Sequence, residues 1–281
     1  MATFRFRLLS VFAETPLGGN PLAVFEDARG LSEKTMQALA LQFNLSETTF
    51  ILPSSKATAR MRIFTPGFEM PFAGHPTLGT AQVVRDLLET GDALTLEMQA
   101  GIIPVSAVGA RWQLAANAPT TRAPGSTRVQ IAAALNLSAD DISGEPLWVN
   151  TGSEQLVVPL ASVDAVRRCR PDAALIEAHC HNGERAMTYV WALNEANHAE
   201  VRFFFPKNGA PCEDPGTGSA CANLGGYLLA RGETLPLHWT LSQGTQINKA
   251  CTLTLDIDAA GQIYVGGRVV ELGRGEINLP D

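Results

Sequence analysis

The sequence lacks the basic segments that are usual in proteins that bind nucleic acids or anionic membranes. Its 281 residues include 21 Lys and Arg against 28 Asp and Glu, a net charge of −7, and no run of Lys or Arg occurs. Proteins that bind polyanions attract them with clustered positive charge. We therefore expect neither nucleic acid nor a membrane surface to be the main partner.

Long hydrophobic runs are also absent. The longest stretch without a charged residue covers 16 residues, 215–230, and it contains a proline and four glycines. A membrane-spanning helix needs about 20 mostly apolar residues. The first residues, Met1–Arg7, show no apolar signal-peptide core. The sequence thus predicts a cytoplasmic protein.

Cysteine is scarce, and the cysteines show no paired spacing. There are five cysteines, an odd number, and no Cys-x-x-Cys occurs. This argues against a disulfide framework and against a zinc ribbon. The tripeptide His179-Cys180-His181 is the best metal candidate, but adjacent side chains rarely all point at one ion. We expect no metal site there and interpret this tripeptide as a polar helix end.

Several short segments occur twice in the same order. Phe64-Thr65-Pro66 returns 140 residues later as Phe204-Phe205-Pro206, and His75-Pro76 has a counterpart in Asp214-Pro215. Further echoes join Gly19-Asn20 to Gly152-Ser153, and Gln99-Ala100-Gly101 to Gln243-Gly244. The near-constant offset predicts two homologous halves, 1–118 and 119–281, with the terminal strand 268–281 as a candidate to pack on the first half. The alternative is a single α+β domain in which these echoes are coincidental.

The periodicity of the chain predicts few helices and many strands. Strands are expected at 3–11, 22–25, 48–52, 59–64, within 94–114, and at 155–160, 186–193, 199–205, 237–242, 251–257 and 262–271. Helices are expected at 32–43, 76–89, within 163–179 with a break at Pro171, and at 215–231, and a linker at 117–128. Strands do not alternate one-to-one with helices, which argues against a doubly wound sheet. The predicted fold class is α+β, with two pseudo-symmetric halves, each a curved mixed or antiparallel sheet around one central helix.

The segments before the two central helices are the best places for chemistry. Residues 72–77 and 213–219 each lead to a helix N-terminus, which offers backbone N–H groups to an anion such as a carboxylate. His75 and Asp214 hold equivalent positions there, so each half has one titratable group for proton transfer. The alternatives are an N-cap role for Asp214 and an ordinary loop histidine. By itself, Glu47 is typical of a solvated strand-edge residue.

A set of ordered motifs resembles the phenazine-biosynthesis PhzF-like family, within the diaminopimelate-epimerase-like superfamily. The resemblance runs nearly end to end. The motifs are Gly19-Asn20-Pro21-Leu22-Ala23-Val24, Asn44-Leu45-Ser46-Glu47-Thr48, Phe64-Thr65-Pro66, Pro71-Phe72-Ala73-Gly74-His75-Pro76-Thr77, Thr151-Gly152-Ser153-Glu154 and Glu213-Asp214-Pro215-Gly216-Thr217-Gly218-Ser219-Ala220.

The resemblance implies an isomerase that transfers protons at carbon without metal or cofactor, with its active site between two similar halves. The family acts on a dihydro-hydroxyanthranilate in its best understood member, so the expected partner is a small, possibly cyclic, carboxylate substrate. The resemblance also implies a homodimer. The catalytic residues it implies are Glu47 as acid/base, His75 and Asp214, and the substrate-binding residues are Gly74, Gly218, Ser219 and Asn20.

The chain departs from the family pattern after Gln243-Gly244, where Ile247-Asn248-Lys249-Ala250 replaces the usual Met-Gly-Arg-Pro. Paired-thiol racemisation is excluded, because residues 70–77 contain no cysteine. Rossmann and Gly-x-Ser-x-Gly sites are excluded by their missing glycines. The alternative from another class is a non-catalytic binding or scaffold protein that retains the family's binding site.

Overall fold

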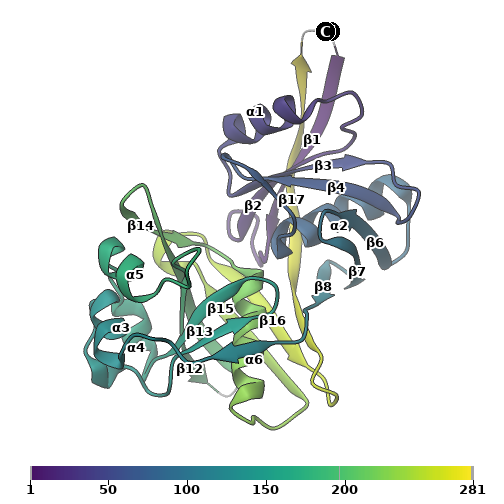
Figure 1. The fold of residues 1–281 in the computed structure, drawn as a ribbon. Coiled ribbons are helices and arrows are strands. Elements are labelled where there is room, and N and C mark those ends of the chain that lie inside the picture. The colour runs from purple at the N-terminus through teal and green to yellow at the C-terminus, as the bar shows by residue number, and fades with distance from the viewer. Residues whose placement is uncertain (1, 196, 280–281) are drawn as a thin grey trace. The chain divides into compact units, whose positions relative to one another are not determined.

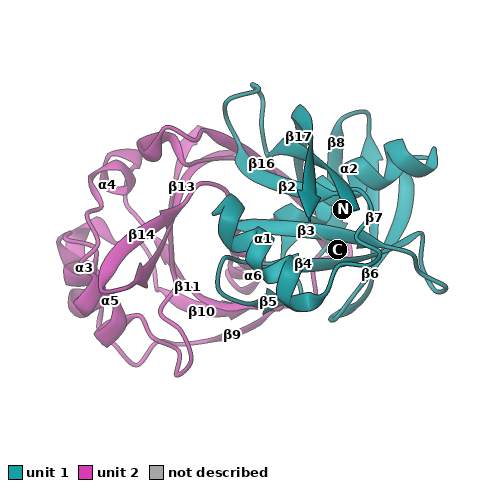
Figure 2. Cartoon of the chain, turned by 90° about the horizontal axis from the view of Figure 1, so that it is seen from above, with its two compact units in different colours: residues 1–115, 266–281 teal, residues 116–265 magenta. Residues whose placement is uncertain are grey.

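The computed structural model describes residues 2–195 and 197–279, and the chain divides into two compact units (Figure 2). Unit 1 consists of residues 1–115 and 266–281, and unit 2 of residues 116–265. The predicted second half begins at residue 119, whereas unit 2 begins at residue 116. The terminal strand, expected as a candidate to pack on the first half, belongs to unit 1 from residue 266 onward.

Unit 1 is a sheet whose strand pairings close on themselves. The order is β17-β1-β2-β3-β4-β6-β7-β8, and β8 pairs with β17 again, while the short β5 pairs with β4. The strands are β1 (Ala2–Val11), β2 (Asn20–Phe25), β3 (Glu47–Leu52), β4 (Ala59–Phe64), β5 (Glu69–Met70), β6 (Ala93–Met98), β7 (Gly101–Val108), β8 (Arg111–Ala115) and β17 (Ile263–Leu279). The first and last strands of the chain, β1 and β17, run side by side in this unit (Figure 1).

The helix α2 (Gly74–Leu88) is surrounded by this sheet. It contacts β1, β2, β3, β4, β6 and β8, and its first eleven residues are almost all buried. Small side chains permit the close approach: a Cβ at Gly79 would lie 2.5 Å from a methyl carbon of Leu22. Most of the surface of α2 is therefore buried, as expected for a central helix. The other helix of this unit, α1 (Glu33–Phe43), packs on the outer side of the sheet against a cluster of phenylalanines that includes Phe25, Phe50 and Phe64.

Unit 2 repeats this plan. Its strands pair in the order β9-β10-β11-β12-β13-β15-β16, with β14 on β13. The strands are β9 (Thr120–Arg122), β10 (Leu147–Asn150), β11 (Glu154–Pro159), β12 (Thr188–Glu195), β13 (His198–Lys207), β14 (Ala210–Asp214), β15 (Leu237–Gln243) and β16 (Cys251–Ile257). The central helix α6 (Gly218–Ala230) contacts strands from both ends of this row, β9 and β16, so the sheet curves around it.

The outer face of the unit 2 sheet is covered by short helices. They are α3 (Arg128–Ala134), α4 (Val163–Arg168) and α5 (Ala173–His179), with the 3₁₀ turn η1 (Ala139–Asp141) against α3. A second 3₁₀ turn, η2 (Thr245–Ile247), follows β15. The apolar side chains of the three helices form a second core with Trp148, Val158 and Phe204 from the sheet. Each of α3, α4 and α5 begins at a side-chain cap, provided by Thr127, Ser162 or Asp172.

The pairing pattern supports an internal repeat. From β1 to β7 the pairs are antiparallel, parallel (β2/β3), antiparallel, antiparallel (β5), parallel (β4/β6) and antiparallel, and the same six types recur from β10 to β16. The register matches as well. Thr48 pairs with Phe64 in unit 1, and Thr188 pairs with Phe204 in unit 2, at the predicted offset of 140 residues.

The predicted elements are found with shifted ends. The helix at 32–43 has its expected cap at Ser32 and a left-handed Asn44 at its end, and the region 163–179 is broken around Pro171. The two central helices do not start at Pro76 and Pro215 as predicted. α2 begins earlier, at Gly74, and α6 begins later, at Gly218, because Asp214 still belongs to β14. The predicted linker, 117–128, contains β9.

Among the described residues, no helix combines the length and the apolar character needed to cross a bilayer.

The close packing of α6 can be tested at Gly226. A Cβ there would lie 2.7 Å from Cβ of Pro119 and 2.8 Å from Cγ1 of Val149, both of which are stiff side chains. Overpacking costs about 1–3 kcal/mol, whereas alanine gains at most about 1 kcal/mol in helix propensity. We expect Gly226→Ala to lower the free energy of unfolding in urea by about 1–2 kcal/mol. Gly91→Ala, where nothing lies within 4 Å, is the control. Equal stability of the two variants would contradict this packing argument.

Candidate functional site

Unit 1 brings Glu47 and His75 into contact. Glu47 is the first residue of β3, directly after the chain leaves α1 through the left-handed Asn44. His75 lies in the first turn of α2, and its Nδ1 is 3.4 Å from Oε2 of Glu47. The glutamate side chain is 15% exposed, and that of the histidine is 6% exposed. The Glu47 carboxyl group is thus in contact with a buried imidazole.

Burial controls the charge of His75. Desolvation lowers the pKa of this imidazole to about 3, and a hydrogen bond to the backbone of Pro21 opposes that effect only in part. At neutral pH the ring is therefore uncharged, and its contact with Glu47 is not an ion pair. A neutral imidazole has one N–H donor and one acceptor, so it can orient a carboxyl group or relay its proton.

Two further predicted residues lie at the start of neighbouring elements in unit 1. Asn20 is the first residue of β2 and is fully buried, and β2 runs parallel to β3 with Leu22 opposite Glu47. Gly74 is the first residue of α2, whose N-cap position, Ala73, provides no side-chain cap. An uncapped helix N-terminus presents backbone N–H groups and a partial positive charge.

In unit 2 the predicted residues lie within one short segment. Asp214 ends β14, Gly218 begins α6, and Ser219 follows in the first helical turn. Gly218 is buried, whereas Asp214 and Ser219 are partly exposed. The N-cap residue, Thr217, makes no side-chain capping bond, so this helix also begins uncapped.

The segment 214–217 is held by Gln243. Its Oε1 accepts from the backbone N–H of Thr217 at 3.2 Å, and its Nε2 donates to the Asp214 carbonyl and to Thr217 Oγ1, both at 2.9 Å. The Thr217 hydroxyl in turn donates to Oδ2 of Asp214. Gln243 is 1% exposed. This clamp fixes the orientation of the Asp214 carboxyl group as a hydrogen-bond acceptor.

The altered loop at 247–250 lies next to this clamp. Gly244 has a φ of 76°, and a Cβ there would lie 2.3 Å from the Lys249 carbonyl and 2.5 Å from the Pro215 carbonyl. The loop that begins at Gly244 is therefore packed directly against the backbone that follows Asp214. The departure from the family pattern therefore lies in a loop that packs next to the predicted site residue Asp214.

Sequence reasoning missed the buried amides of unit 2. Besides Gln243, these are Gln155 on β11 and Asn223 on α6, and Gln155 donates to Ser219 Oγ at 2.9 Å. A signal was present for Asn223, since it is the one strongly polar side chain in the otherwise small and apolar segment 220–226. Gln155 gives no comparable signal, because glutamine in a strand is ordinary.

Metal binding is not suggested by the described residues, which contain no group of three or more His, Cys, Asp or Glu side chains placed to hold an ion. His179 ends α5, and Cys180 is buried at the C-cap.

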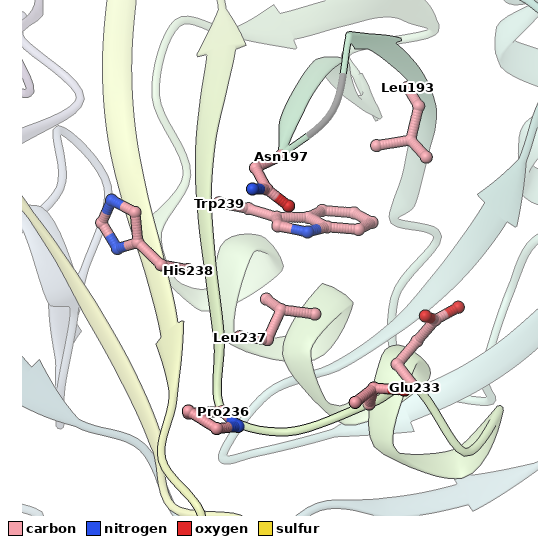
Figure 3. A pocket seen from close by; sticks show the side chains of 8 residues that line it. Leu193, Asn197, Glu233, Pro236, Leu237, His238 and Trp239 are labelled. Carbon is pink, nitrogen blue, oxygen red and sulfur yellow. The ribbon is translucent and has the colours of Figure 1, made fainter.

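A pocket of about 490 Å³ lies elsewhere in unit 2, beside the β12–β13 turn (Figure 3). Its lining consists of Leu193, Asn197, Glu233, Thr234, Pro236, Leu237, His238 and Trp239. None of the predicted site residues belongs to this lining.

Comparison with known proteins places the chain among isomerases. The sequence profile of the phenazine biosynthesis-like protein family matches residues 9–275. An uncharacterized isomerase of Pasteurella multocida is 41% identical, covering 100% of this chain and 96% of that protein. The trans-2,3-dihydro-3-hydroxyanthranilate isomerase of Pseudomonas aeruginosa is 34% identical, covering 98% and 99%.

Solved structures agree. A phenazine biosynthesis protein of the PhzF family from Bacillus anthracis superimposes with a TM-score of 0.89 at 27% identity, covering 99% of this chain and 100% of that one. A hydroxyproline epimerase from Agrobacterium vitis, at 11% identity and a TM-score of 0.63 over 99% and 93% of the chains, shares the fold alone. The prediction of the family and of its α+β fold is confirmed, and the chain belongs to the PhzF-like, phenazine biosynthesis-like family of isomerases.

Proposed function

We propose that this chain is an isomerase that shifts a proton at carbon in a small carboxylate-bearing metabolite, with Glu47 as the acid/base. The observation that carries the proposal is the 3.4 Å contact between the Glu47 carboxyl group and the buried imidazole of His75. The named activity of the Pseudomonas aeruginosa relative supports a dihydro-hydroxyanthranilate or a similar cyclic acid as the substrate class. The homodimer and the cytoplasmic location remain predictions.

The role of Glu47 follows from proton-transfer chemistry. A carboxylate can remove a proton from a carbon acid, hold it, and return it to another carbon, which moves a double bond or inverts a centre. The neutral His75 beside it can orient the carboxyl group or donate a hydrogen bond to a substrate heteroatom. It adds no positive charge, so it does not weaken Glu47 as a base by pairing with the carboxylate.

The internal repeat supports a single acid/base of this kind. Glu47 directly precedes Thr48, and the equivalent position before Thr188 is held by Met187. A thioether cannot transfer protons. We therefore assign proton transfer at this position to unit 1 alone.

Unit 2 is proposed to provide the anion-binding groups. Ser219 and the backbone at Gly218 lie in the first turn of an uncapped helix, where a partial positive charge favours a carboxylate. Asp214, held as an acceptor by Thr217, is proposed as a second titratable group that can receive a hydrogen bond from the substrate. Stabilising negative charge in this way lowers the barrier to removing a proton from carbon.

The acid/base role is tested by solvent deuterium incorporation read by mass spectrometry. Protein is incubated in heavy water with trans-2,3-dihydro-3-hydroxyanthranilate and a panel of small cyclic and amino carbon acids. We expect wild type to label at least one compound, and Glu47→Gln to lower the rate by about 10²–10⁴, the usual contribution of general acid/base catalysis. Glu184→Gln, an exposed loop position, is the matched control and should keep the wild-type rate.

Two outcomes of this experiment contradict the proposal. Label that persists at the wild-type rate in Glu47→Gln excludes Glu47 as the acid/base. Binding of a panel compound without any label, unaffected by Glu47→Gln, indicates a non-catalytic binding protein.

The neutral state of His75 predicts a particular acid sensitivity. Its pKa is about 3 in the folded chain and near 6.5 when unfolded, so the unfolded chain binds the extra proton between these values. Its contribution to stability is complete above pH 6.5 and is lost as the pH falls toward 3, by up to about 1.4 kcal/mol per pH unit. Between pH 7 and pH 5, wild type should lose about 2 kcal/mol more than His75→Gln, measured by urea unfolding. The same pH dependence in both proteins would show that His75 is not kept neutral by burial.

A further inference from the structure

A chain of buried hydrogen bonds in unit 2 leads from the backbone to Ser219. The backbone N–H of Thr151 donates to Oδ1 of Asn223 at 2.9 Å, and the Thr151 hydroxyl donates to the same oxygen at 2.7 Å. Nδ2 of Asn223 donates to the Ser153 carbonyl at 2.8 Å and to Oε1 of Gln155 at 2.9 Å. Nε2 of Gln155 then donates to Oγ of Ser219 at 2.9 Å. Three elements, β11, α6 and the loop before β11, contribute to this network.

The direction of every bond in this chain is fixed. A backbone N–H can only donate, so the atom of Asn223 that faces Thr151 must be the oxygen, and its NH₂ group must face Gln155. Gln155 is then forced to present its oxygen to Asn223 and its NH₂ group to Ser219. Ser219 therefore accepts from Gln155, and its own O–H proton remains available to donate in another direction.

The two units provide an internal comparison for this network. The matched registers make Leu22 of β2 equivalent to Gln155 of β11, and Gly79, the sixth residue of α2, holds the place that Asn223 holds as the sixth residue of α6. Leu22 is completely buried, and a Cβ at Gly79 would lie 2.5 Å from it. The same positions of the same fold are thus filled in unit 1 by a leucine and a glycine, which have no polar side-chain atoms.

This comparison argues that the amides serve more than packing. Gln155 is 1% exposed and Asn223 is not exposed, and buried amides are costly unless all their hydrogen bonds are made. Unit 1 shows that the fold accepts apolar residues here. Of the three side chains, only Ser219 is partly exposed, so it is the end of the network that a ligand can reach.

We propose that Gln155 and Asn223 are positioning residues that fix the Ser219 hydroxyl as a hydrogen-bond donor to the substrate's carboxylate. This inference rests on the proposed function, which assigns a carboxylate-bearing substrate to the chain. By accepting from Gln155, Ser219 is polarised and oriented, and a charged acceptor strengthens the bond it donates. A ligand with an uncharged amide in place of the carboxylate would gain much less binding free energy from this hydrogen bond.

The test measures binding without turnover. Affinities for 3-hydroxyanthranilate and for its carboxamide are compared by calorimetry in wild type, Ser219→Ala, Gln155→Leu and the double variant. Gln155→Leu installs the residue that unit 1 carries at this position, which favours folding. We expect wild type to prefer the carboxylate. Ser219→Ala should weaken carboxylate binding about 10-fold, typical of a hydrogen bond to a charged group, and carboxamide binding less.

The double variant separates positioning from a general structural effect. If Gln155 acts through Ser219, Gln155→Leu should weaken carboxylate binding about 3- to 10-fold in wild type and have no further effect in Ser219→Ala. Effects that multiply in the double variant would overturn the inference, as would a wild type with no preference for the carboxylate, including one that binds neither ligand. Asn223→Val is a second variant and should resemble Gln155→Leu in its ligand preference.

The outcome is independent of the deuterium experiment. Carboxylate preference that depends on Ser219 and Gln155, together with no labelling of any panel compound, would contradict the proposed isomerase while supporting this inference. Labelling that depends on Glu47, with carboxylate affinity unchanged in Gln155→Leu, would support the proposed isomerase and contradict this inference.

Discussion

The enclosure of α2 and α6 by their sheets is the constraint on which the other features depend. A helix buried on nearly all sides must be built from small and apolar residues, as the approach of Gly79 to Leu22 shows. Its flanks are therefore unsuited to chemistry. The site residues proposed above lie instead in the first turn of each helix or at the start of a neighbouring strand. His75, Ser219 and Glu47 all occupy such positions.

The internal repeat separates residues that the fold needs from residues with another role. Six strand pairings have the same type in both units, so equivalent positions face equivalent packing demands. The contrasts stand out against this background: Glu47 against Met187, and the aliphatic Leu22 against the amide Gln155. Since the fold accepts either member of each pair, these differences are best explained by chemistry. The two units thus share an architecture and differ in the groups they present.

Local signals in the sequence predicted elements well and element ends less well. Ser32, Asn44 and Pro171 act through their own backbone geometry, so the ends that they set were predictable. Proline at the first helical position predicted the wrong start for α6, because Gln243, 29 residues away, holds the carbonyl of Asp214 in place at the end of β14. No local pattern reveals such a clamp. Glu47 likewise looked like an ordinary strand-edge glutamate, and only the ordered family motifs identified it.

In unit 2, backbone N–H groups set the hydrogen-bond polarity of the side chains that are proposed to bind the ligand. The N–H of Thr151 fixes Asn223 and, through it, Gln155 and Ser219, while the N–H of Thr217 fixes Gln243 and, through it, the Thr217 hydroxyl that donates to Asp214. The hydrogen-bond series through Gln155 ends in a donor, the Ser219 hydroxyl. The series through Gln243 ends in an acceptor, the Asp214 carboxyl group. Amides suit this task because they transmit direction without adding charge, whereas a buried carboxylate or ammonium would require its own partner. A small acid with both a carboxylate and a donor group would match this pair of ends.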